Sequence, residues 1–196
     1  VAIGTNAGND NQRPSTVAIG RGAGQTSQRD FSISIGRDSG QTSQQAYSIS
    51  VGREAGRMSQ GINSVAIGYQ AGCNTQKEYA IAIGEKAGFT DQATNSIAMG
   101  YQAGLTSQQN YSVAIGTDTG MTSQGQYSVA IGRNAASNAQ NNFSVAIGNN
   151  AGKNIQMQRS IAIGDNAAAV YQDPYAIAVG YRSGMSNQTS NAIAIG

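Results

Sequence analysis

Nucleophilic catalysis is the first chemistry to consider, because the chain is rich in serine and contains one cysteine, Cys73. A serine or cysteine nucleophile is usually activated by a histidine, and the sequence contains no histidine. The serines also recur at a fixed spacing, which a structural role predicts and a single active site does not. We therefore expect no enzymatic activity, and we interpret Cys73 as an ordinary occupant of a variable position.

Acidic residues could hold a metal ion, but none recurs in every repeat, as the aspartates of calcium-binding β-rolls do. They are Asp10, Asp30, Asp38, Glu54, Glu78, Glu85, Asp91, Asp118, Asp165 and Asp173. A zinc site would need more cysteine or histidine ligands than one cysteine. The sequence therefore predicts neither a metal nor a cofactor.

Three arginines, Arg21, Arg37 and Arg53, recur at a spacing of sixteen, with Asp38 and Glu54 beside two of them. They could form a ligand face for an anionic glycan. The alternative, which we favour, is a solvated turn edge on which charges of both signs alternate. The net charge of +2 is too small to predict a nucleic-acid partner. No apolar run approaches the ~18 residues of a membrane span, so we expect no membrane insertion.

A sixteen-residue repeat positions all of these side chains. Counted from Val1, glycine occupies repeat position 4 thirteen times and glutamine occupies position 12 twelve times, without an insertion. Position 1 is always Val or Ile, position 3 is usually Ile, positions 2 and 16 are small, and position 15 favours aromatic residues. Residues that define the repeat include Ile3, Gly4, Gly8, Gln12, Val17, Ile19, Gly20, Gln28, Val65, Ile67, Gly68, Gln76, Val113, Ile115, Gly116 and Gln124.

The repeat predicts an all-β fold, a parallel β-solenoid (β-roll) with two short strands in each coil. Alternation of large and small residues over positions 15 to 3 indicates one strand, and positions 9 to 12 form the second. Glycine at positions 4 and 8 brackets a turn. A strand–helix–strand crossover needs about 30 residues, so sixteen are too few. At about 4.8 Å per strand, twelve coils predict a rod of about 58 Å.

This pattern also predicts which side chains face inward. We expect the large aliphatic residues of positions 1 and 3 to fill the interior, together with positions 10 and 12. Stacked glutamines at position 12 would form an amide ladder. The small residues of positions 16 and 2 would then lie outside, where their uniform size favours close contact with another subunit, in a homotrimer or a filament.

We expect a single repeat array over residues 1–196, taken from a longer chain. Its coils are 1–16, 17–32, 33–48, 49–64, 65–80, 81–96, 97–112, 113–128, 129–144, 145–160, 161–176 and 177–192, with a partial coil at 193–196.

Four Ser-Val-Ala-Ile-Gly segments, at 64–68, 112–116, 128–132 and 144–148, resemble the head repeats of trimeric autotransporter adhesins. The extended pattern is also similar to repeats in fibre proteins of phages and large viruses. The resemblance covers all coils, although the period is slightly longer than in the known heads. It implies a left-handed parallel β-roll, assembled as a trimer and displayed on a bacterial surface.

The function that we predict is a non-catalytic, structural segment of an extracellular, cell-surface or virion-surface fibre, which supports adhesion to a host or matrix. One alternative is an adhesin head that binds a glycan or a matrix protein directly, through Arg21, Arg37 and Arg53. A third is an ice-binding solenoid, for which threonine recurs at position 10 in about half of the coils.

Overall fold

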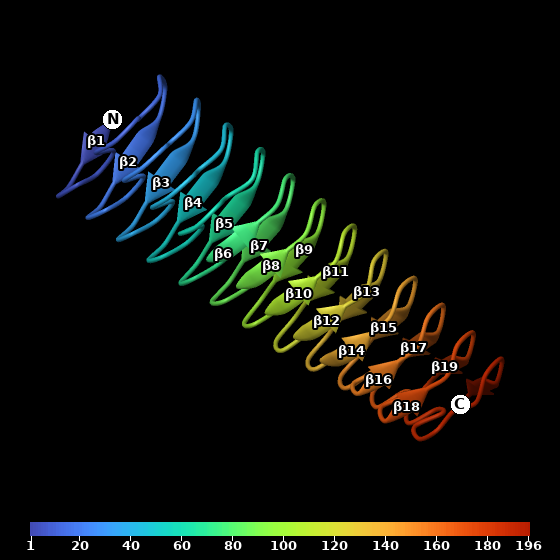
Figure 1. The fold of residues 1–196 in the computed structure, drawn as a ribbon. Helices are drawn as coiled ribbons and strands as arrows, with labels where there is room; N and C mark the ends of the chain where they lie inside the picture. The colour runs from blue at the N-terminus through green and yellow to red at the C-terminus, as the bar shows by residue number, and fades with distance from the viewer. The chain divides into compact units, whose positions relative to one another are not determined.

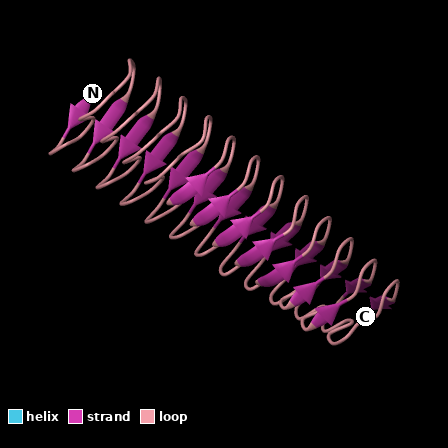
Figure 2. Cartoon of the chain, in the orientation of Figure 1, coloured by secondary structure: helices cyan, strands magenta, loops and turns pink.

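The computed structural model describes all 196 residues and contains strands and turns but no helix (Figure 2). The chain divides into two compact units, Val1–Ser96 and Ile97–Gly196. Each unit is a parallel β-solenoid in which sixteen residues make one turn (Figure 1). This confirms the predicted fold class, with about six turns in each unit. The left-handed coil and one uninterrupted array over 1–196 stay predictions.

The first strand of each coil covers repeat positions 1 to 3 and pairs with its equivalent sixteen residues along the chain. In β2 and β3, for example, Val17 pairs with Ile33 and Ile19 pairs with Ile35. The strands of this sheet in the first unit are β1 (Ala2–Ile3), β2 (Val17–Ile19), β3 (Ile33–Ile35), β4 (Ile49–Val51), β5 (Val65–Ile67) and β7 (Ile81–Ile83). Those in the second unit are β9 (Ile97–Met99), β11 (Val113–Ile115), β13 (Val129–Ile131), β15 (Val145–Ile147), β17 (Ile161–Ile163), β19 (Ile177–Val179) and β20 (Ile193–Ile195).

The second strand ends at the glutamine of position 12, as predicted. In the first unit these strands are β6 (Asn74–Gln76) and β8 (Thr90–Gln92), and the earlier coils form single bridges instead. In the second unit they are β10 (Thr106–Gln108), β12 (Thr122–Gln124), β14 (Asn138–Gln140), β16 (Ile155–Gln156) and β18 (Tyr171–Gln172). Both sheets keep the register of sixteen.

The prediction that the large side chains of positions 1 and 3 face inward, and the small ones of positions 16 and 2 outward, is wrong. Ala18, at position 2, is completely buried, whereas its neighbours Val17 and Ile19 are partly exposed. The same holds along both units: except at Ala2, Ala7, Ala192 and Ala194 near the ends of the chain, the small residues of positions 2, 7 and 16 are buried, and Ile67 is 38% exposed. Position 12 faces inward as predicted, but the threonines of position 10 are only half-buried. The interior is therefore lined by alanine, serine, glycine and glutamine.

The narrowness of the coil explains this inversion. A methyl group added at Gly24 would lie 2.5 Å from Gln28 Oε1 and 3.4 Å from the Cβ of Ala18. The space between the two sheets is thus already filled by one glutamine and a few small side chains per coil. An isoleucine turned inward would overpack this interior, so the larger aliphatic side chains point away from it.

Candidate functional site

A file of buried glutamine side chains occupies the centre of each unit. In every coil the glutamine Nε2 donates to the carbonyl of the position 1 residue in the same coil, for example Gln124 to Val113 at 2.7 Å. In most coils it also donates to the glutamine of the next coil, as Gln124 does to Gln140 Oε1 at 3.3 Å and Gln76 to Gln92 Oε1 at 3.1 Å. The predicted amide ladder is therefore present within each unit, and it satisfies most of the polar groups that would otherwise be costly to bury. The exception is Gln108 Oε1, which is buried without a hydrogen-bond partner.

Two buried serines extend this ladder in the first unit. Ser34 Oγ donates to Gln44 Oε1 at 2.5 Å and accepts a weak bond of 3.5 Å from Gln28 Nε2. Ser50 Oγ donates to Gln60 Oε1 at 2.6 Å. Serine at position 2 thus has a function that alanine cannot fulfil, because it connects consecutive glutamines.

The glycines of position 4 are required by the contact between coils. Gly20 has a φ of +124°, and a methyl group there would lie 2.6 Å from the carbonyl oxygen of Gly36. Gly4, Gly68 and Gly116 meet the next coil in the same way. At position 8 the constraint is weaker, because alanine occupies it at Ala136 with a φ of 47°. Position 4 therefore fixes the tight stacking of the backbone.

The apolar face consists of the Val, Ile and Met side chains at positions 1 and 3 of the first sheet. These side chains alternate with the buried position 2 residues, so all of them leave the sheet on its outer side. Val113 pairs with Val129, and Ile115 pairs with Ile131, so equal side chains stand beside each other from coil to coil. The outcome is a continuous, partly exposed aliphatic surface along each unit.

Aromatic side chains at position 15 stack along the same coils. Phe31 and Tyr47 have ring centroids 5.2 Å apart, and Tyr127 and Phe143 have centroids 5.3 Å apart. Each of these four residues has a left-handed backbone conformation, with φ from 56° to 60°. A bulky residue seldom adopts such a φ, at a cost of about 1–2 kcal/mol per residue. Position 15 has this φ in coils without a ring stack as well, for example at Asn63 and Tyr79, so the turn geometry of the repeat imposes it.

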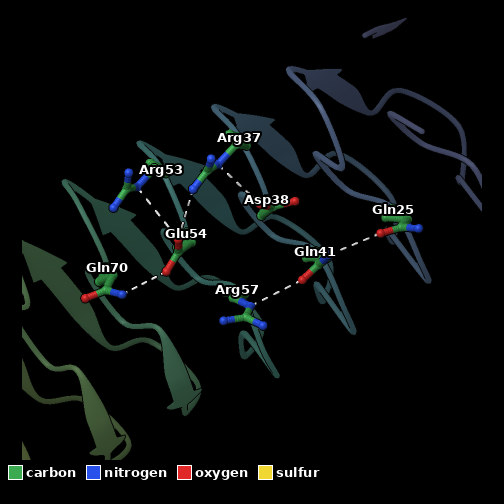
Figure 3. A network of polar contacts seen from close by, with 8 residues as sticks. All are labelled: Gln25, Arg37, Asp38, Gln41, Arg53, Glu54, Arg57 and Gln70. Carbon is green, nitrogen blue, oxygen red and sulfur yellow. Dashed lines mark hydrogen bonds and ion pairs between the residues drawn. The ribbon is translucent and has the colours of Figure 1, made fainter. Parts of the chain in front are cut away.

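The three arginines predicted as a ligand face lie on successive coils of the first unit, since the amide of Asp38 donates to the carbonyl of Arg21 at 2.8 Å and the amide of Glu54 donates to that of Arg37 at 2.9 Å. Two of them, Arg37 and Arg53, are paired with carboxylates (Figure 3). Arg37 lies 3.5 Å from both Asp38 Oδ2 and Glu54 Oε1, and Arg53 Nε lies 3.7 Å from the same Glu54 oxygen. Arg21 makes none of these ion pairs. The arrangement matches the solvated edge of mixed charge, and the glycan face stays a prediction.

The carboxylate of Glu54 is the centre of this network. Gln70 Nε2 donates to Glu54 Oε2 at 2.8 Å, and this hydrogen bond lowers the pKa of Glu54 below its usual value of 4.5. Arg53, Arg57 and Arg37 lower the pKa further by Coulomb attraction, against the opposing effect of burial. Arg57 belongs to a neighbouring chain of contacts, in which its Nε donates to Gln41 at 3.3 Å (Figure 3).

Cys73 is buried, with 2% of its surface exposed, and burial raises the pKa of its thiol. A raised pKa keeps the sulfur protonated and unreactive at neutral pH. No group of three or more His, Cys, Asp or Glu side chains is placed to hold a metal ion. No helix has the length and apolar character of a membrane span.

The threonines of position 10 bind the backbone of the next coil through their hydroxyl groups. Thr26 donates to the carbonyl of Gln41 at 3.2 Å, and Thr122 donates to that of Ser137 at 3.1 Å. An ice-binding face would present its hydroxyls to water, so this geometry does not favour that alternative.

Comparison with known proteins gives one family. The YadA head domain repeat model matches four segments that together make up half of the chain, at residues 59–72, 92–119, 123–151 and 157–183. No curated protein and no solved structure matches significantly. The matched segments include position 4 glycines, position 12 glutamines and parts of the apolar face.

Proposed function

Because the chain belongs to the YadA head domain repeat family, we propose that it is a stiff, non-catalytic segment of an adhesin-like fibre on the outside of a cell. Its coils contact only their neighbours, so a segment of this kind can be lengthened by adding repeats. The fibre would hold a binding region away from the surface that carries it. Attachment to a host or matrix is the activity that such a segment supports.

The apolar face carries this proposal, because an aliphatic surface of this extent is unusual on a soluble monomer. In each coil two Val or Ile side chains remain partly exposed, and covering each of them would contribute about 1 kcal/mol. Over the coils of one unit this is enough to hold subunits together. We propose that the face covers itself by self-association into a homotrimer, the arrangement implied by the adhesin heads.

The proposed subunit contact involves positions 1 and 3, and not positions 16 and 2 as predicted from the sequence. The small side chains of positions 16 and 2 were expected to form the contact, but they are buried inside the coil. The contact therefore involves residues such as Ile115 and Ile131 instead. The uniform smallness of positions 16 and 2 reflects the interior and carries no information about partners.

Sedimentation equilibrium of the purified chain tests the proposed assembly. We expect a trimer for the unchanged chain and a monomer for the double variant Ile115→Asp, Ile131→Asp. The matched control is Ser107→Asp, Ser123→Asp, which places the same charges on the outer side of the second sheet, and it should remain trimeric. A monomer for the unchanged chain over the whole concentration range would refute the assembly.

Direct adhesion through the arginine edge is the second candidate function, and the absence of an ion pair at Arg21 favours it. Binding of the chain to an array of anionic glycans would test this site. The triple variant Arg21→Ala, Arg37→Ala, Arg53→Ala should then lose binding. Binding that is unchanged in this variant would exclude the site while leaving the structural function intact.

A further inference from the structure

Two tyrosines in the second unit are held as a parallel pair. The rings of Tyr111 and Tyr127 have centroids 5.0 Å apart and an interplanar angle of 5°. They precede β11 and β13, which pair in register, and the amide of Tyr127 donates to the carbonyl of Asn110 at 3.1 Å. Their backbones have nearly equal φ values of 58° and 56°. The two parallel rings therefore stack on consecutive coils.

The pair is the one stack in the chain that consists of two phenols. The other two stacks, Phe31–Tyr47 and Tyr127–Phe143, each contain a phenylalanine. Tyr111 and Tyr127 are 49% and 47% exposed, so both rings are open to an oxidant in solution. Tyr175, by contrast, neighbours Arg159, whose Nη1 donates to its phenolic oxygen at 3.1 Å.

We propose that Tyr111 and Tyr127 form an intramolecular dityrosine cross-link under one-electron oxidation. Each phenol loses one electron and one proton and becomes a tyrosyl radical. The radicals join through ring carbons ortho to the oxygens, and the two ortho protons move so that both phenols are restored. The oxidant is hydrogen peroxide acting through a haem peroxidase, and one peroxide is reduced to two waters. Atoms balance, because the protein loses two hydrogens in total.

The fold favours this coupling over competing reactions of the same radicals. Ladder pairing already holds the two rings together, so the bond-forming step is intramolecular. The rings must turn about their Cβ–Cγ bonds from face-to-face stacking, so that one ortho carbon of each meets the other. A tyrosyl radical beside phenylalanine, as at Tyr47, has no phenol of its own chain next to it. The product joins residues sixteen apart on neighbouring coils and opposes their separation. Oxidation would thus stabilise a fibre segment against unfolding at one defined pair of coils.

Mass spectrometry of the intact chain and of its peptides tests the proposal after treatment with hydrogen peroxide and a haem peroxidase. We expect a product of single-chain mass that has lost two hydrogens, with the peptides of Tyr111 and Tyr127 joined. Tyr127→Phe should reduce this product about tenfold or more, because it keeps a stackable ring but removes the phenol. Tyr175→Phe is the matched control and should leave the yield unchanged.

Three results would overturn the proposal. The first is no joined peptide under conditions that couple free tyrosine. The second is an equal yield from Tyr127→Phe with a circular dichroism spectrum like that of the unchanged chain. The third is a product that consists of covalent multimers alone, which would place the coupling between chains. None of these results bears on the self-association measured by sedimentation.

Discussion

Replacing Gln124 by alanine is expected to destabilise the second unit strongly. The side chain is completely buried and takes part in three hydrogen bonds. It donates to Val113 O at 2.7 Å and to Gln140 Oε1 at 3.3 Å, and it accepts from Gln108 Nε2 at 3.1 Å. Each bond contributes about 1 kcal/mol net, and Gln140 Oε1 left without this donor adds about 1–2 kcal/mol. The free energy of unfolding should fall by about 4 kcal/mol.

Urea denaturation followed by far-ultraviolet circular dichroism measures this loss. The matched control is Gln126→Ala in the same coil, because the Gln126 side chain makes no hydrogen bond and only its backbone amide contacts Asn142, at 2.8 Å. The control should change stability by less than about 0.5 kcal/mol. A loss below about 1 kcal/mol for Gln124→Ala, or equal losses for both variants, would refute the amide ladder as a source of stability.

Three further outcomes are expected. Gly132→Ala should cost at least about 3 kcal/mol in thermal or urea unfolding, because its Cβ would lie 2.6 Å from the Gly148 carbonyl oxygen at a φ of +124°. Gly152→Ala should cost less, about 1–2 kcal/mol, because its Cβ would lie 2.8 Å from a side-chain atom, Gln156 Oε1, and Ala136 already occupies position 8; equal losses would contradict the proposed difference between the two glycine positions. The lowered pKa of Glu54 means that its contribution is present above its usual pKa of 4.5 and is lost as the pH falls below it. The melting temperature of Glu54→Gln should therefore fall less than that of the unchanged chain between about pH 7 and about pH 3, and identical falls would contradict this.

Sequence periodicity was sufficient to predict the architecture, because a register of sixteen follows directly from glycine at position 4 and glutamine at position 12. The strands at Val17–Ile19 and Thr122–Gln124 lie where alternation and turn residues place them. The turn glycines have the positive φ that their type indicates. The strands and turns depend on neighbouring residues, and the register depends on the repeat period, so both can be read from a single sequence.

Alternation alone could not predict which side chains of the first strand face inward. Alternation separates Ala18 from Val17 and Ile19, but it does not say which set faces inward. Burial of large aliphatic side chains is the usual outcome, and it fails here because the space between the sheets is narrow. A signal was present in the sequence: positions 2, 7 and 16 accept only small residues, and a strict limit on size indicates an interior.

The charged edge shows a similar limit. Alternating Arg37, Asp38, Arg53 and Glu54 predicted neighbouring charges of opposite sign, and the ion pairs follow from the stacking of coils. The part played by Gln70 was not predicted, since its hydrogen bond to Glu54 depends on side-chain geometry across two coils. Side-chain contacts between coils can be predicted only once it is known which side of the coil each repeat position faces.

Nuclear Overhauser effects from the glutamine side-chain amides test the central claim most directly, because that claim places stacked glutamines inside the coil and the large aliphatic side chains outside it. Labelled glutamine should give cross peaks between the side-chain amides of Gln108 and Gln124, and from Gln124 to the methyl group of Ala114. Cross peaks from these amides to the side-chain methyl groups of Val113 and Ile115, without contact between the two glutamines, would contradict it.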